Sequence, residues 1–521
     1  MSLAAPPEGN ASITTGTGSP GLLRVLGPGM AIAVVVGNTI GSGIFAKPGI
    51  IAANGGSFPL IMTVWLAGTV LCILGTLCLA ELAVMLPRAG GLYVYLREAY
   101  GGTAAFLFGW QELFLNRPAS TGALATICIA SLSNVLGIPF SIPFAVFLAS
   151  LLVVGMAGIN MLGVLWGGWT QAITTVIKGG FVAFVALLPV ALQGMGYGVM
   201  DAARFSETVT PLQPGTSAQV AAVLLAVLWA YNGWEGIAPV AEEIRDPRRN
   251  IPIALFGGIG ILALLYLGAT LAYHSVVPME EMIRPENRHH VAELMVTRLL
   301  GPIGGTLMSA GIMLSTFGTV NSNTMLSPRI TYAMGRDGAF FPVFGKVHPR
   351  FRTPIAAIAV QAFMTVALLI VSAVLIQMIP FFRDHSVFDL LTNCVVLISS
   401  VFYALAVGAV VVLRRTQPER ERPFRTPLYP VIPIVYLIVN AWFLYQISFG
   451  QPVETFVGLG FILLGIPVYH HFRKSRPASP VGFDPPLADS GDAADVPAAG
   501  SLAAARLEAA AAPVASSSTT P

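Results

Sequence analysis

The sequence predicts an all-α membrane protein that crosses the lipid bilayer many times, and its composition is the first observation behind that prediction. Of 521 residues, 55% are apolar and only 10% are charged, and the mean hydropathy is +0.75. Soluble domains carry about 25% charged residues, so this chain has too few to cover a soluble surface. A soluble enzyme, an intrinsically disordered chain and a basic nucleic-acid-binding protein are therefore excluded.

The second observation is the recurrence of apolar segments along the chain. Twelve of them reach the length of about 20 helical residues that a hydrocarbon core of about 30 Å requires. Helices are expected rather than strands because the segments lack the apolar–polar alternation of an outer-membrane barrel. The predicted spans cover residues 28–53, 58–85, 104–134, 140–159, 163–193, 217–241, 251–277, 303–328, 354–376, 387–413, 428–449 and 452–472.

The loops between the spans predict the orientation. Twenty of the 28 basic residues fall on the cytoplasmic side if the N-terminus is cytoplasmic, against five on the other side. Because cytoplasmic loops are enriched in Lys and Arg, we expect both termini in the cytoplasm and the protein in the cell (inner or plasma) membrane. Residues 1–27 form an N-terminal tail without a cleavable signal peptide. Residues 473–521 form a tail that we expect to be disordered, with a short helix over 498–511 as the alternative.

Small and helix-breaking residues interrupt two spans at mid-depth. The first span contains Gly-Asn-Thr-Ile-Gly-Ser-Gly over 37–43, and the sixth contains Trp-Ala-Tyr-Asn-Gly-Trp-Glu-Gly over 229–236. These spans are five apart, as expected if residues 28–193 and 217–413 form two inverted repeats, with two extra helices over 428–472. Paired interruptions are typical of a transporter binding site, because unwinding frees backbone groups that a ligand can satisfy.

The freed backbone groups suit a zwitterionic ligand. Amides around Gly41, Ser42 and Gly43 would bind a carboxylate, and carbonyl groups of the sixth span would bind an ammonium group. The alternative is that Gly37 and Gly41 form a GxxxG helix-packing motif. The second interruption, five spans later, favours the binding interpretation.

Six charged residues lie inside spans, where each costs at least about 2.5–3.5 kcal/mol at a helix centre and needs a partner or water. We expect Lys47 and Glu81, near span ends, to snorkel to the membrane surface. Glu112 and Arg117 share a span five residues apart, and a structural pairing is expected of them. The remaining two lie at or opposite the interruptions.

Three residues near the interruptions are candidates for gating or coupling. Lys178 lies in the middle of the fifth span without an acidic residue in that span, so it either couples transport or acts as a structural cation in place of a metal ion. Glu235 either stabilises the unwound segment of the sixth span or faces the pathway. Trp229 lies far from the membrane interfaces where tryptophan usually sits, and it is either a lid over the substrate or part of the core.

Signatures of catalysis are missing from the sequence. It contains no nucleotide-binding, hydrolase or metalloprotease motif, and its seven His and four Cys residues form no cluster with the spacing of metal ligands. We therefore expect no cofactor, no metal site, no nucleic-acid partner and no enzymatic activity.

Six motifs carry a resemblance to a known family. They are Gly-Ser-Gly-Ile-Phe at 41–45, Ala-Glu-Leu with Pro-Arg-Ala-Gly-Gly-Leu-Tyr over 80–93, Arg-Pro at 117–118, Ala-Tyr-Asn-Gly-Trp-Glu with Glu-Glu and Asn-Ile-Pro over 230–252, Phe-Gly-Thr-Val-Asn with Arg and Gly-Arg-Asp-Gly over 317–338, and Arg-Pro-Phe with Pro over 422–427. With these motifs in the family's order, residues 22–472 resemble the amino acid–polyamine–organocation superfamily, in particular its L-type amino acid transporter branch.

The resemblance implies the LeuT-type 5+5 inverted-repeat fold with discontinuous first and sixth helices. Lys178 matches a lysine that, in sodium-independent members, stands where sodium-coupled relatives bind a cation. The implied function is sodium-independent exchange of amino acids by alternating access, with proton-coupled amino acid or polyamine symport, or a non-transporting amino acid sensor, as alternatives. Together with the interruptions themselves, the resemblance assigns substrate binding to Thr39, Ile40, Gly41, Ser42, Gly43, Trp229, Ala230, Asn232 and Gly233.

Two departures from the family pattern concern partners and specificity. Heteromeric members carry a cysteine between spans 3 and 4 that joins them to a glycoprotein, whereas the loop over 134–139 has none here. No disulfide-linked heavy chain is therefore expected, and the expected partners are an amino acid substrate and the lipid bilayer. Asn232 stands where glycine is frequent, which leaves the side-chain specificity open.

Overall fold

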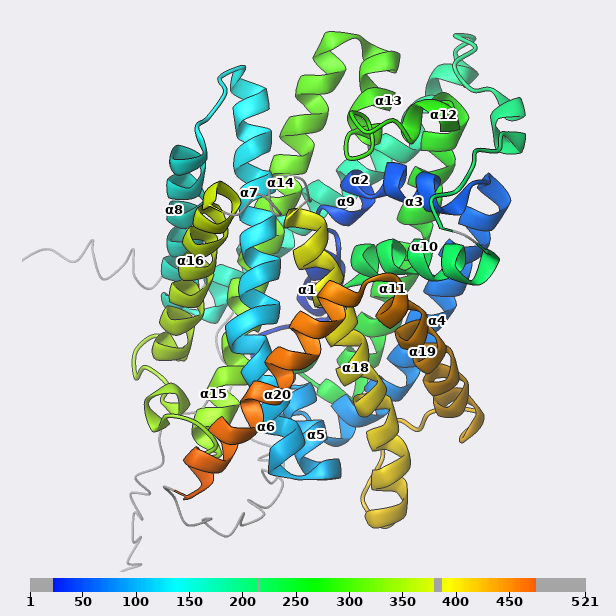
Figure 1. Ribbon diagram of the computed structural model, residues 1–521. Helices are drawn as coiled ribbons and strands as arrows, with labels where there is room; N and C mark the ends of the chain where they lie inside the picture. Colours follow the sequence, from blue (N-terminus) through cyan, green and yellow to red (C-terminus); the bar gives the residue numbers. More distant parts are fainter. Residues whose placement is uncertain (1–21, 214, 379–386, 475–521) are drawn as a thin grey trace, which may run out of the picture. The chain divides into compact units, whose positions relative to one another are not determined.

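The apolar segments of the chain form helices, which satisfy their backbone hydrogen bonds internally and so can cross lipid. The computed structural model describes residues 22–213, 215–378 and 387–474 (Figure 1). Within those ranges the β-type pairing consists of two isolated bridges, Leu26 with Ile244 and Ser57 with Thr208. The all-α prediction is confirmed. The predictions for the two tails fall on residues outside the described ranges, apart from residues 22–27, 473 and 474.

The elements of the first half of the chain are arranged as follows. They are α1 (Pro28–Thr39), α2 (Gly43–Ala46), α3 (Pro48–Gly55), α4 (Phe58–Met85), α5 (Leu92–Tyr100), α6 (Gly102–Gln111), the π-helical turn η1 (Glu112–Asn116), α7 (Arg117–Leu136), α8 (Ile142–Met161), α9 (Val164–Gly194), the 3-10 turn η2 (Ala202–Ser206) and α10 (Thr216–Tyr231).

The second half continues with longer helices and short connecting turns. Its elements are the 3-10 turn η3 (Ala238–Glu243), α11 (Pro247–Val276), α12 (Met279–Met282), α13 (Val291–Leu300), α14 (Pro302–Leu326), α15 (Pro328–Arg336), the 3-10 turn η4 (Pro342–Gly345), α16 (Ile355–Met378), α18 (Val387–Thr416), α19 (Val431–Gly450) and α20 (Pro452–Lys474).

The number of long membrane-crossing helices is smaller than the sequence predicts. In the described part of the chain, eleven helical segments are long and apolar enough to cross a membrane, against twelve predicted spans. The difference lies in the sixth predicted span, 217–241, whose helix α10 stops at Tyr231 after 16 residues. The other predicted spans correspond to these long helical segments, with ends that differ by a few residues.

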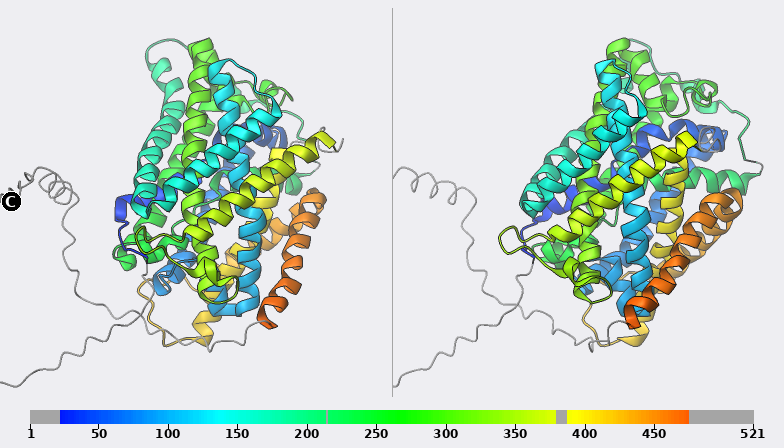
Figure 2. Two further views of the ribbon diagram at one scale, coloured as in Figure 1. Left: turned by 90° about the vertical axis from the view of Figure 1, so that its left-hand side faces the viewer. Right: turned by 60° about the vertical axis from the view of Figure 1, so that its left-hand side comes forward.

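The two interrupted helices lie among the others rather than at their edge. α1 packs against α9, α11 and α14, whereas α10 packs against α3, α4, α18 and α19. α7 and α14 lie side by side along much of their length. On their far side, α8 and α16 pack against each other (Figure 2). Residues of these four helices form a separate apolar cluster that includes Val153 and Ile358. The interruptions are thereby enclosed by helices on several sides.

Large apolar side chains that the protein leaves exposed gather on the peripheral helices. Examples are Phe147 on α8, Val176 on α9, Phe363 on α16 and Phe456 on α20, which are between 60% and 81% exposed. In a soluble protein such a surface would be unfavourable, but hydrocarbon is its natural surrounding. The chain is a multi-pass membrane protein. Its contacts divide it after Phe472.

Candidate functional site

The first interruption lies between α1 and α2. α1 ends at Thr39, Ile40 takes an extended conformation (φ −70°, ψ 94°), and the chain becomes helical again at Gly43. Among the described residues, the backbone amides of Gly41, Ser42 and Gly43 donate no hydrogen bond, and the buried Ser42 hydroxyl has no partner either. The interruption therefore presents unused hydrogen-bond donors inside the protein.

Oxygen atoms at the same interruption are satisfied by neighbouring helices. The Ile40 carbonyl accepts a hydrogen bond from Thr319 Oγ1 of α14 at 2.8 Å, and the Thr39 carbonyl lies 3.2 Å from the Tyr266 hydroxyl of α11. An unpaired backbone group costs several kcal/mol in lipid, which explains why these acceptors are covered. The donors remain for a ligand.

The second interruption follows α10. α10 ends at Tyr231 and η3 begins at Ala238, and between them Gly233 has a φ of +103°. That conformation favours glycine and cannot continue a helix, which is why the predicted span 217–241 is not one helix. The Gly233 carbonyl accepts a hydrogen bond from Asn38 Nδ2 of α1 at 2.8 Å, so the two interruptions are joined directly.

The two interruptions also meet through their backbones. A Cβ atom on Gly43 would lie 2.6 Å from the Cα atom of Ala230, so no larger residue fits there unless the backbones separate. The Tyr266 hydroxyl lies 3.0 Å from the Ala230 carbonyl and 3.2 Å from the Thr39 carbonyl. Tyr266 and Asn38 were not predicted as site residues, because the residues that they contact are distant in the sequence.

A small cavity lies between the interruptions and is walled by α7 and α14 as well. Ile40 and Ala230 do not line this cavity and are almost completely buried. The other seven residues predicted to bind substrate do line it, namely Thr39, Gly41, Ser42, Gly43, Trp229, Asn232 and Gly233. Residues that the sequence analysis did not assign to the substrate site complete the wall, namely Asn38, Arg117, Ser120, Leu124, Thr319 and Asn323.

Three of the missed residues give the wall a polar face. Asn323 Nδ2 donates a hydrogen bond to Ser120 Oγ at 3.2 Å, and Thr319 bonds to the first interruption. Polar side chains in the middle of membrane helices tend to bond across helices. Their position in apolar spans was therefore a usable signal, although it does not say which helices they join.

Lys178 lies behind the first interruption, completely buried on α9. Its Nζ atom donates to Thr319 Oγ1 at 3.0 Å and to the Gly37 carbonyl. Within the described residues no carboxylate pairs with it, and no group of three or more His, Cys, Asp or Glu side chains could hold a metal ion. Lys178 thus links α9, α14 and α1 through neutral oxygen atoms.

A buried ion-pair cluster lies behind the second interruption. Glu112 and Arg117 flank the π-helical turn η1, whose wider winding brings residues five apart onto one face, and Arg117 Nε donates to the Glu112 carboxylate. Arg117 Nη2 also donates to Glu235 Oε1 at 3.1 Å. The predicted pairing of Glu112 with Arg117 is present, and Glu235 is a member of the same cluster.

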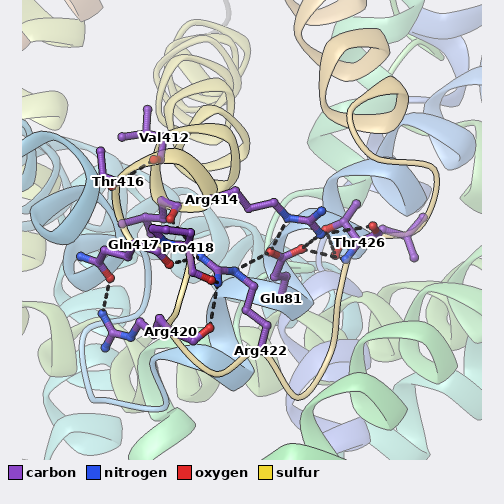
Figure 3. A network of polar contacts seen from close by, with 11 residues as sticks. Glu81, Val412, Arg414, Thr416, Gln417, Pro418, Arg420, Arg422 and Thr426 are labelled. Atoms are coloured by element: carbon purple, nitrogen blue, oxygen red, sulfur yellow. Dashed lines mark hydrogen bonds and ion pairs between the residues drawn. The ribbon is translucent and has the colours of Figure 1, made fainter.

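Two charged residues behave differently from their prediction. Lys47 and Glu81 are 2% and 1% exposed, so the expectation that they snorkel is wrong. Glu81 accepts hydrogen bonds from Arg414 and the Thr426 amide, which fasten the loop between α18 and α19 to the end of α4 (Figure 3). Lys47 Nζ donates to Thr392 Oγ1 at 3.0 Å. Partners from distant segments make burial possible.

Further ion pairs lie at the ends of α5 and α15 and on η3. Arg329 pairs with Glu243 at 2.8 Å, and both side chains are almost completely buried. Arg97 pairs with Asp337. Burial disfavours the charged form of Arg97, but the adjoining carboxylate outweighs it and raises the pKa of Arg97. These pairs connect α5, η3 and α15, which carry three of the motifs found in the sequence.

Comparison with known proteins places the chain among transporters. Residues 26–469 match the amino acid permease family. The serine/threonine exchanger SteT of Bacillus subtilis (strain 168) is 30% identical over 463 residues, which is 88% of this chain and 98% of the exchanger.

Mammalian relatives match over a similar stretch. Human large neutral amino acids transporter small subunit 2 is 30% identical over 474 residues, covering 89% of this chain and 83% of that protein. Human b(0,+)-type amino acid transporter 1 is 30% identical over 461 residues, covering 87% and 88%. These relatives are transporters rather than enzymes. The chain therefore belongs to the amino acid permease family, within the amino acid–polyamine–organocation superfamily.

Proposed function

We propose that the chain is a sodium-independent secondary active transporter of amino acids that works by alternating access and exchanges one amino acid for another. The observation that carries this proposal is that both helix interruptions line one buried cavity. One interruption brings amides that donate no hydrogen bond within the described residues. Such a cavity suits the α-carboxylate and the α-ammonium group that all amino acids share.

The substrate carboxylate binds the free amides of Gly41, Ser42 and Gly43, with the Ser42 hydroxyl as a further donor. The ammonium group binds carbonyl oxygens of the second interruption. The Ala230 oxygen already accepts one hydrogen bond, from the Tyr266 hydroxyl, but a carbonyl oxygen has two lone pairs and can accept a second. The Gly233 oxygen already accepts two, from Asn38 Nδ2 and the Gly236 amide, so it is not assigned to the ammonium group. Trp229 closes the cavity over the bound substrate.

Lys178 supports sodium independence. Its ammonium group lies among oxygen atoms of α1 and α14, and a fixed positive charge there repels a second cation. Exchange is supported by the Bacillus relative, which is by name an exchanger. Proton-coupled symport is the second candidate, because Lys178 is an ionisable side chain that lies beside the first interruption without a carboxylate partner within the described residues.

The proposed architecture follows the sequence prediction. Residues 28–193 and 217–413 form two inverted repeats, residues 428–472 add two helices, the protein lies in the cell (inner or plasma) membrane, and both termini are cytoplasmic. No disulfide-linked heavy chain is needed. All four cysteines are buried, so none is placed to bond a partner, although one human relative is by name a small subunit.

Proteoliposomes test the proposal. The purified full-length chain is reconstituted, and uptake of a panel of radiolabelled amino acids is measured with sodium or choline outside, and with or without unlabelled amino acid inside. We expect uptake that depends on internal amino acid and not on sodium. Uptake into empty vesicles driven by a pH gradient would instead support symport. Binding without any uptake would contradict transport and support a sensor.

A further inference from the structure

A second cavity adjoins the substrate cavity on the far side of Asn232. It lies between α4, α10, α18 and α19, and it is lined among others by Cys72, Ser400, Tyr436 and Asn440. None of its lining residues is charged. Asn232 lines both this cavity and the substrate cavity, so its side chain stands at the boundary between them.

Asn232 is held at that boundary by side-chain contact rather than by backbone strain. Its Nδ2 atom lies 3.4 Å from Ser399 Oγ of α18, and its backbone angles (φ −58°, ψ 133°) are open to any residue. A shorter side chain at this position therefore widens the connection between the two cavities. The backbone does not require asparagine there. Gly233 beside it already supplies the unusual conformation that the interruption needs.

One residue that lines the second cavity has an unused hydrogen-bond acceptor. Asn440 is 2% exposed, and its Oδ1 atom has no hydrogen-bond partner within the described part of the chain. A buried acceptor left unpaired costs about 1–3 kcal/mol, so a ligand with a donor would be favoured there. Arg117 and Glu235, which pair with each other, line a neighbouring cavity together with Glu112.

We infer that Asn232 closes the entrance of the second cavity and so sets the size limit for substrate side chains, and that a shorter residue at position 232 opens this cavity to neutral side chains that end in a hydrogen-bond donor. This inference rests on the proposed transport function. In the natural protein the substrate cavity alone is open, so small neutral amino acids are the substrate class. Charged side chains are disfavoured because the second cavity offers them no counter-ion.

The test compares uptake ratios within each reconstituted protein, which removes differences in yield. Glutamine and methionine are similar in length, but only glutamine ends in an N–H donor. We expect Asn232→Ala to raise glutamine uptake relative to serine about tenfold, in the range that pocket volume controls, and methionine uptake by less. Asn232→Gly provides a second variant should the first fold poorly, and Gln446→Ala on α19 is the control.

A variant at Asn440 tests the hydrogen bonding of the second cavity independently of its size. In the Asn232→Ala background, Asn440→Leu should cancel the advantage of glutamine over methionine while methionine uptake stays raised, and Gln446→Leu should not. Unchanged glutamine-to-serine and methionine-to-serine ratios in both Asn232 variants would overturn the inference. If the natural protein takes up no amino acid, the proposed function itself has failed, which is a different result.

Discussion

The two helix interruptions differ in the backbone groups that they leave unpaired and in the charged side chains that lie beside them. The first leaves amides free, and the buried cation Lys178 lies behind it. At the second, the Gly233 carbonyl accepts hydrogen bonds, and two carboxylates beside it, Glu112 and Glu235, pair with the guanidinium of Arg117. Under the proposed function, this arrangement of charges attracts a carboxylate to one interruption and an ammonium group to the other. We therefore propose that the pair, rather than either interruption alone, recognises a zwitterion.

Separating the backbones of the two interruptions should have the largest effect on uptake. Gly43→Ala places a Cβ atom 2.6 Å from the Ala230 Cα atom, which forces the backbones to separate, so we expect uptake to fall to background while membrane insertion persists. Gly155→Ala, which meets nothing within 4 Å, is the matched control. Normal uptake by Gly43→Ala would show that the close approach is not required.

Removing the guanidinium behind the second interruption should have the next largest effect. Arg117→Met leaves two buried carboxylates without their cation, a change that costs about 3–5 kcal/mol. We expect a marked fall in the melting temperature of the purified protein, partly reversed by Glu235→Gln in the same chain. Arg248→Met breaks an exposed pair with Glu421 and should change little. Equal melting temperatures for the Arg117 and Arg248 variants would contradict the cluster's importance.

Removing the cation behind the first interruption should change how transport is coupled. Lys178→Ala deletes the bonds to Gly37 and Thr319, and we expect a changed dependence of uptake on external pH or on internal amino acid. Lys346→Ala, an exposed lysine, serves as control. If both dependences match those of the unchanged protein, Lys178 has a structural role only.

The smallest effect is expected where a hydroxyl group bridges both interruptions. Tyr266→Phe keeps the ring and leaves the Ala230 and Thr39 carbonyls without their donor, at a cost of about 1–3 kcal/mol. A severalfold fall in uptake at unchanged protein amount is expected. An effect as large as that of Gly43→Ala would mean that the hydroxyl, and not backbone contact, holds the interruptions together.

Much of the fold could be predicted from local sequence, whereas the contacts of the site could not. Span lengths follow from apolar runs, and the glycines at 41, 43 and 233 marked the interruptions. The sixth span was nevertheless predicted to extend to residue 241, because hydropathy contains no information on backbone conformation such as the positive φ of Gly233. The cavity-lining residues of the first interruption were predictable because they lie within a few positions of one another.

Long-range partners explain what was missed. Arg117 and Glu235 are 118 residues apart, and Asn38 and Gly233 are 195 apart, so no local pattern connects them. The π-helical turn that lets Glu112 meet Arg117 also has no clear sequence signal. Lys47 and Glu81 were expected at the surface because their partners, on α18 and in the loop that follows it, are more than 300 positions away.

Competition by substrate analogues tests the central claim that the two interruptions together bind a zwitterion. Uptake of a radiolabelled amino acid that the reconstituted protein transports is measured against an excess of the same amino acid, its carboxamide and its N-acetyl derivative. The carboxamide lacks the carboxylate and the N-acetyl derivative lacks the ammonium group. We predict that only the unmodified amino acid competes. Strong competition by either derivative would contradict recognition of both charged groups at the paired interruptions.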